Sequence, residues 1–204
     1  MSATELAFLQ TYRQRRERVA QWVRAAVGNG GGVVIVPTAP EAMRNRDSDY
    51  PYRHDSYFYY LTGFTEPEAV LAIVVPAGNA PARSVLFCRP KHEEREIWDG
   101  FRFGPEAAKE AFGLDEAHSV EEIDATLPKL LANAAAVAYP LAESGTFDRR
   151  MRRCRLQVAL LDHDRRHLRR ILEAHDRIAH EVRARDPAAV VAVLLERGVP
   201  HLVA

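Results

Sequence analysis

Two groups of side chains have the residue types that could do chemistry, and neither is a complete site. His163 and His167 are four residues apart, a spacing that can bring two imidazoles on one helix face to a single metal ion. No third ligand accompanies them, so the sequence favours a solvated helix face. His54 and Asp55 precede Ser56, but no strained turn surrounds this serine as a nucleophile of that kind requires. We therefore predict no catalytic residue and no metal site in this chain.

A glycine-rich run at residues 28–32 could suggest a loop that binds phosphate. The run follows a helical pattern and precedes a strand pattern. A phosphate-binding loop has the reverse order, because it follows a strand and opens a helix. We interpret the run as a linker.

The most distinctive segment, residues 47–69, is a polar loop that leads through an aromatic run and a turn into an apolar run. The aromatic residues 57–62 are predicted to form a strand, and residues 69–75 a buried strand. Gly63 fits the turn between them, and Pro67 fixes φ before the second strand. The polar loop has four charged residues that could form ion pairs and bind backbone amides, namely Asp47, Asp49, Arg53 and Asp55.

The elements around this segment follow from hydrophobic periodicity and from helix and turn signals. We predict helices over residues 1–27, 91–98, 105–112 and 119–131, and strands over residues 33–36, 57–62, 69–75, 84–88 and 135–139. Ser119 followed by Glu122 forms a capping box at the start of the last helix. The short turns between the three middle strands predict an antiparallel meander. The fold class is therefore α/β, a mixed β-sheet flanked by helices.

The composition is that of a globular protein whose balanced charges give no strong overall electrostatic field. Hydrophobic residues make up 47% of the 204 residues, and 28 basic residues balance 28 acidic ones. A neutral chain has no global electrostatic field that would attract nucleic acid or anionic membrane, although a local basic patch could still do so. No apolar run approaches the roughly 20 residues that span a bilayer. The two cysteines, without a signal-peptide pattern before them, indicate reduced thiols and a cytoplasmic location.

The composition changes near residue 150. No Phe, Tyr or Trp follows Phe147, and five of the eight histidines lie after residue 160. Residues 146–185 can be drawn as one long helix rich in Arg and His. We therefore predict a domain over residues 1–150 and a helical tail over residues 151–204.

The segment from residue 49 resembles the N-terminal domain of aminopeptidase P, in the creatinase/prolidase superfamily of M24B-type metallopeptidases. Residues that match the family signature, to which we assign a structural role, are Asp49, Tyr50, Arg53, Ser56, Tyr60, Thr62, Gly63, Glu66 and Pro67. The match continues through Ile97 and Trp98 and covers roughly residues 8–150. The Tyr-Pro-Tyr run and the Ile-Trp pair favour aminopeptidase P over prolidase.

The resemblance implies a non-catalytic domain that precedes a second, catalytic domain. In the family the second domain binds two divalent ions, usually manganese, which activate a hydroxide to cleave the bond before a penultimate proline. This chain has no counterpart of those ligands, so we expect no cofactor in it and no activity of the chain alone. The tail over residues 151–204 is atypical of the family, and we expect it to reflect a truncation or a frameshift.

The resemblance also suggests a role for the stretch around Trp98. From the residues alone, Trp98 is a core or interface anchor at the end of a helical segment. In family tetramers this stretch faces the active-site mouth of a neighbouring subunit. Trp98 and Arg102, together with Arg95, would then form a surface for substrate access or subunit contact.

Three functions stay open from the sequence. The first is the N-terminal part of an Xaa-Pro aminopeptidase, contributing to oligomerisation and active-site access. The second is a stand-alone regulatory module that associates with itself or with a full-length aminopeptidase P. The third is a basic helical tail that binds acidic partners, carried by the N-terminal domain.

Overall fold

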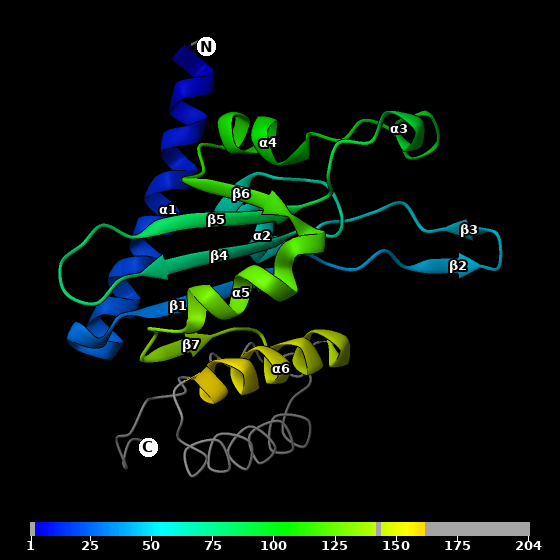
Figure 1. The fold of residues 1–204 in the computed structure, drawn as a ribbon. Coiled ribbons are helices and arrows are strands. Elements are labelled where there is room, and N and C mark those ends of the chain that lie inside the picture. The colour runs from blue at the N-terminus through cyan, green and yellow to red at the C-terminus, as the bar shows by residue number, and fades with distance from the viewer. Residues whose placement is uncertain (1–2, 142–143, 162–204) are drawn as a thin grey trace.

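The computed structural model describes residues 3–141 and 144–161, which form three layers around one β-sheet. The sheet has the strand order β6-β5-β4-β1-β7. In it β4 is antiparallel to both β1 and β5, whereas β6 is parallel to β5 and β7 is parallel to β1. The predicted mixed sheet flanked by helices is confirmed (Figure 1). The strands of this sheet are β1 (Gly32–Pro37), β4 (Val70–Val75), β5 (Arg83–Cys88), β6 (Glu116–Ser119) and β7 (Ala136–Ala138).

The helices cover both faces of the sheet. In chain order they are α1 (Ala3–Val27), α2 (Ser56–Thr62), α3 (Glu93–Asp99), α4 (Gly104–Phe112), α5 (Ile123–Leu131) and α6 (Gly145–Leu161). Short 3₁₀ turns follow α1 at Gly28–Gly30 and precede α5 at Val120–Glu122. α1, α2 and α4 supply the core on one face, and α5 and α6 supply it on the other. α3 and the hairpin of β2 (Met43–Asn45) and β3 (Ser48–Asp49) extend beyond the sheet on the same side (Figure 1).

The central strand β4 shows why this sequence forms a sheet with two covered faces. All six of its residues are apolar and buried. Val70, Ala72 and Val74 lie in the core beneath α5 and α6, and Leu71, Ile73 and Val75 lie in the core beneath α1, α2 and α4. Alternate side chains of a strand point to opposite faces, so only a strand buried on both sides can be apolar throughout.

The prediction that residues 57–62 form a strand is wrong, because these residues form the helix α2. Phe58, Leu61 and Thr62 are the buried residues, and their spacing of three and four is that of a helix face. The side chain of Asp55 caps the helix by accepting a 2.8 Å hydrogen bond from the amide of Phe58. Tertiary packing therefore overrides the strand preference of the aromatic residues.

The antiparallel meander consequently has different members from those predicted. β1, β4 and β5 are the three antiparallel neighbours, and β1 takes the place assigned to residues 57–62. β6 and the β2–β3 hairpin were not predicted, because neither contains an alternating apolar pattern.

Several other boundaries agree with the sequence. The first helix, the strand at Gly32–Pro37 and the helix that Pro105 opens are confirmed. Ser119 also acts as a cap, accepting a 3.2 Å hydrogen bond from the amide of Glu121. It caps a 3₁₀ turn rather than the α-helix itself, and α5 begins at Ile123.

The composition change near residue 150 does not coincide with the end of an element. α6 runs from Gly145 to Leu161 through that position, and Met151 and Cys154 are 1% exposed in the core beneath the sheet. The first turns of the Arg-rich segment therefore pack on the domain. His163, His167 and the rest of the predicted tail beyond Leu161 lie outside the described residues.

Removing the cap of α2 is expected to destabilise the domain moderately. Asp55→Ala leaves the amide of Phe58 without its acceptor, and the free energy of unfolding should fall by about 1 kcal/mol. Urea unfolding followed by circular dichroism measures this change. Asp49→Ala is the control, since Asp49 is an exposed acid on β3. Equal stability of the two variants would contradict the capping role.

Candidate interaction surface

The signature residues around α2 hold the helix in place and do not form a catalytic arrangement. Thr62 is fully buried, and its hydroxyl donates to the carbonyl of Phe58 at 2.8 Å and accepts from the amide of Phe64 at 3.0 Å. Gly63 ends the helix in the left-handed conformation, with φ of 72°. Thr62 and Gly63 thus turn the chain from α2 toward β4. The turn predicted at Gly63 is confirmed.

Tyr60 lies on the exposed side of α2, against two arginines of α1. The Arg15 guanidinium donates to the Tyr60 carbonyl at 2.9 Å and lies 4.1 Å from the centre of its ring. Arg18 donates to the Tyr60 hydroxyl at 2.6 Å. These contacts join α1 to α2 from outside the core.

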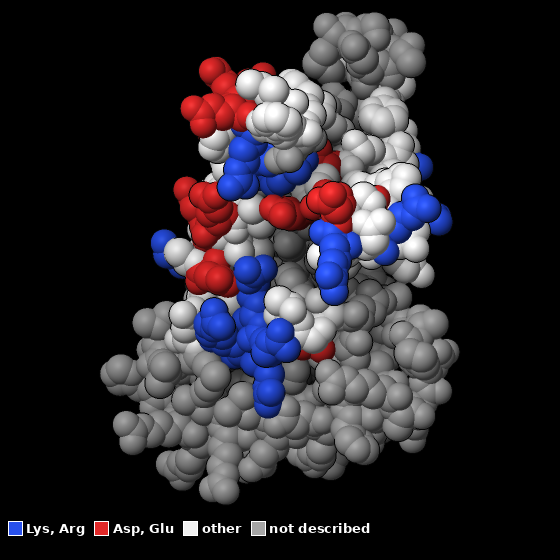
Figure 2. All heavy atoms as spheres, turned by 90° about the vertical axis from the view of Figure 1, so that its right-hand side faces the viewer, with Lys and Arg blue, Asp and Glu red and all other residues white. Residues whose placement is uncertain are grey.

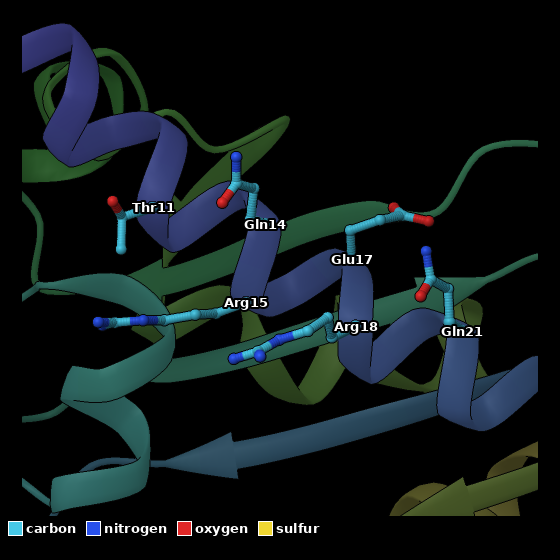
Figure 3. Close-up of a pocket in the computed structure, with 6 residues that line it drawn as sticks. All are labelled: Thr11, Gln14, Arg15, Glu17, Arg18 and Gln21. Atoms are coloured by element: carbon cyan, nitrogen blue, oxygen red, sulfur yellow. The ribbon is translucent and has the colours of Figure 1, made fainter.

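A shallow hollow of about 420 Å³ lies along the same part of α1, lined by Thr11, Gln14, Arg15, Glu17, Arg18 and Gln21. Figure 3 shows Arg15 and Arg18 both directed from α1 toward α2. Their guanidinium groups are bound to Tyr60, as described above. The two cations of the hollow are therefore engaged in packing α1 on α2, and we assign no ligand to it.

Some of the remaining signature residues are exposed and others are buried, and one of the buried residues forms an ion pair. Asp49, Tyr50, Arg53 and Ser56 are exposed, whereas Glu66 and Pro67 are buried. One carboxylate oxygen of Glu66 accepts a 2.7 Å hydrogen bond from the amide of Phe103. The other lies 3.7 Å from the guanidinium of Arg89, which is itself 9% exposed. Glu66 therefore links the start of β4 to the start of α4.

The ion pairs predicted within the polar loop do not form among the residues that the structure describes. Asp55 caps α2, and the backbone amide of Asp47 donates to the side chain of Asn45 at 3.0 Å. No ion pair joins Arg53 to either aspartate or to Asp49 in the described part of the chain. The loop is held instead by these bonds and by the Tyr52 hydroxyl, which lies 2.7 Å from the hydroxyl of Thr38 and donates to the carbonyl of Ala39 at 3.2 Å.

Trp98 and Arg102 lie in different environments. Trp98 on α3 is 87% exposed, whereas Arg102 is 5% exposed. Within this chain Trp98 is thus not a core residue, and the two side chains do not form one exposed surface. The neighbours of Trp98 at the surface are apolar, because Ile97 is 78% and Phe101 is 63% exposed.

We call Ile97, Trp98 and Phe101 the α3 patch. In Figure 2, which shows the side of the molecule toward which α3 extends, uncharged surface gathers at the height of α3 beside acidic side chains. Exposed apolar residues that are contiguous and bordered by charges mark interaction sites in soluble proteins. Tryptophan in particular contributes much of the binding energy at protein interfaces. The α3 patch is therefore the candidate interaction surface of the described domain.

Hydrolytic chemistry would require metal ligands or nucleophiles among the described residues. They contain no group of three or more His, Cys, Asp or Glu side chains that could hold a metal ion. Burial raises the pKa of the Cys88 thiol to about 12 and that of Cys154 to about 11, so both remain protonated and weakly nucleophilic at neutral pH. His54 stacks on the ring of Tyr59 with 4.3 Å between the ring centres.

No helix in residues 3–141 and 144–161 is long and apolar enough to cross a membrane.

The structure defines an α/β domain with an exposed apolar patch and, among its described residues, no metal-binding cluster. A family model described as the N-terminal domain of aminopeptidase P matches residues 12–139. The chain belongs to that family, as the resemblance of the signature segment indicated.

Individual relatives agree with this assignment. The chain is similar to the Xaa-Pro aminopeptidase of Escherichia coli, with 39% identity over 130 residues, covering 64% of this chain and 28% of the relative. Human Xaa-Pro aminopeptidase 3 is 33% identical over 133 residues, covering 63% of this chain and 26% of the relative. A solved structure of an E. coli aminopeptidase P variant matches with a TM-score of 0.66 and 35% identity, covering 72% of this chain and 32% of that one.

The chain thus spans between 26% and 32% of the length of these relatives, and the matched part is their N-terminal region. Aminopeptidase P is a metalloenzyme family, and another solved relative is a zinc-substituted E. coli aminopeptidase P in complex with product. The residues described in this chain do not fit such a metal centre, since they lack a cluster of ligands.

Proposed function

We propose that this chain is the non-catalytic N-terminal domain of a manganese-dependent Xaa-Pro aminopeptidase, and that it contributes to oligomerisation and to active-site access. The observation that carries the proposal is the α3 patch, an exposed apolar surface on a domain of this family. Exposure of these apolar side chains to water is unfavourable, and burying them against a second protein surface would lower the free energy. The partner is a second copy of the chain or a full-length aminopeptidase P.

The two cysteines support a reducing compartment such as the cytoplasm. Cys88 and Cys154 are both free and buried. They belong to the cores on opposite faces of the sheet, so they cannot form a disulfide with each other in this fold. Free thiols of this kind are common in cytoplasmic proteins.

Replacing Trp98 tests the proposed oligomerisation. Trp98→Ser removes the largest side chain of the α3 patch, and self-association of the chain should weaken about tenfold or more. Sedimentation velocity over a range of concentrations measures this. Trp22→Ser is the matched control, because Trp22 is the other tryptophan and is half-exposed on α1. If the chain stays monomeric throughout and does not bind a full-length E. coli aminopeptidase P, the oligomerisation proposal is wrong.

The proposed absence of catalysis is tested directly. The purified chain, supplied with Mn²⁺ and a peptide with proline in the second position, should release no N-terminal residue. The full-length E. coli relative serves as the positive control for the assay. Cleavage by this chain that a chelator abolishes would contradict the non-catalytic assignment.

A further inference from the structure

Residues 91–103 form a segment that extends away from the sheet and returns to it. We call this segment the excursion, and it contains the α3 patch. α3 occupies its middle and lies beyond the end of the sheet (Figure 1). Because Ile97 and Trp98 are largely exposed, they are not held by the core. The direction of the patch is therefore set by contacts at the two ends of the excursion.

Lys91 closes the excursion at its first end. Its ammonium group donates to the backbone carbonyl of Arg102 at 3.0 Å and to the carboxylate of Glu96 on α3 at 2.9 Å. It also lies 4.3 Å from the centre of the Phe101 ring. A lysine has three N–H donors and a charge that an aromatic face attracts, so one group can join all three elements. Lys91 thus contacts α3, the returning backbone and one residue of the α3 patch.

The second end of the excursion is anchored independently. The amide of Phe103 donates to the carboxylate of Glu66, and the Phe103 ring packs against Phe64 and Phe112 with ring centres 6.0 and 5.1 Å away. The two ends also approach closely, because a Cβ on Gly104 would lie 3.2 Å from the Cβ of Lys91. Glu66 and the phenylalanines hold the base to the sheet, and the Phe101 ring lies 5.1 Å from the ring of Phe103. Lys91 reaches from the base to α3 through Glu96.

We propose that Lys91 is a positioning residue for the α3 patch. Its ammonium holds Phe101 and α3 in one orientation, so the patch is organised before a partner binds. Preorganisation of this kind raises affinity because less conformational entropy is lost on binding. The proposal rests on the proposed function for the role of the patch, but the positioning itself is a property of the free chain.

The test uses Trp98 as its own probe. In a Trp22→Phe background, Trp98 is the sole tryptophan, and time-resolved fluorescence anisotropy reports its local motion on the nanosecond timescale. Lys91→Met should increase the fast component of that motion, and Lys91→Arg should restore it because a guanidinium can make the same contacts. Self-association of Lys91→Met should also weaken about tenfold. Lys109→Met is the control, since Lys109 is exposed on α4 away from α3.

The outcomes separate this proposal from the function on which it rests. Unchanged motion of Trp98 in Lys91→Met overturns the positioning role, whatever happens to association. If the chain associates weakly and Trp98→Ser does not change that association, the proposed function is wrong. The anisotropy result would still test the positioning role of Lys91. Thermal unfolding checks that Lys91→Met is folded. If it is not, Glu96→Ala removes one acceptor of Lys91 and should increase the motion of Trp98 in the same direction, with no change counting against the proposal.

Discussion

Arg16→Met is expected to lower the free energy of unfolding by about 3 kcal/mol, with a melting temperature lower by roughly 6–12 °C. Arg16 lies on α1 with 3% of its surface exposed. Its guanidinium donates to the carbonyl of Leu61 at 3.0 Å and to the carbonyl of Gly113 at 2.6 Å. These carbonyls lie at the ends of α2 and α4, where helices have unpaired acceptors and partial negative charge. One side chain therefore ties three helices together.

The charge of Arg16 is compatible with this burial. Burial lowers the pKa of its guanidinium to about 10, and the group still carries its proton at neutral pH. The negative charge of Asp115 opposes this lowering of the pKa, and the carboxyl ends of the two helices add further negative potential. Methionine would fill much of the volume but leave both carbonyls without their donor, and the unmade hydrogen bonds account for the expected loss.

Two further variants make this prediction specific. Arg13→Met changes an exposed arginine one turn earlier on α1 and should alter stability by less than about 0.5 kcal/mol. Arg16→Lys should lie between wild type and Arg16→Met, because an ammonium lacks the fork that reaches two carbonyls at once. Urea unfolding of all three measures the series. Equal stabilities of Arg13→Met and Arg16→Met would show that the two backbone contacts contribute little.

The second large effect is expected at Gly63. A Cβ at this position would lie 2.9 Å from two ring carbons of Tyr12, a distance shorter than van der Waals contact. The backbone there has φ of 72°, which costs a non-glycine residue about 1–2 kcal/mol. Tyr12 is 5% exposed and has little space to move, so overpacking adds about 1–2 kcal/mol. Gly63→Ala should therefore destabilise the domain by about 3 kcal/mol.

Gly113→Ala separates the two causes. Gly113 ends α4 in the same left-handed conformation, with φ of 59°, but a Cβ there would meet only side-chain atoms of Leu9 at 3.7 Å or more. It should cost about 1–2 kcal/mol from the backbone alone. The difference between the two variants in chemical denaturation measures the clash with Tyr12. No difference would mean that Tyr12 moves aside freely.

Arg16 and Gly63 both act where α2 packs against α1. Gly63 must be small because Tyr12 of α1 covers it, and the carbonyl of Leu61 must face Arg16 of the same helix. Tyr60 is held from outside by Arg15 and Arg18. The signature on α2 thus encodes its docking onto α1, and no residue of it is placed as a nucleophile or a base.

Much of the fold could be predicted because it depends on local signals. α1, β1 and β4 have long apolar patterns, and Pro105 marks a helix start that needs no tertiary information. The family could also be recognised, because the signature combines residues that cannot replace one another. The strand predicted at residues 57–62 was wrong because local preference and tertiary contacts disagree there, and β6 and the β2–β3 hairpin were missed because they lack an alternating apolar pattern.

Periodicity and signature residues are properties of the chain alone, and they were sufficient to predict the family, the apolar strands of the sheet and the first helix. That residues 57–62 form a helix could be known only from the fold, because the burial of Phe58 and Leu61 depends on α1 and the sheet. The fold alone placed Trp98 in solvent and Arg102 in the interior, although they are four residues apart. Their exposure depends on how the excursion is closed by Lys91 and Glu66, and that closure joins residues distant in sequence.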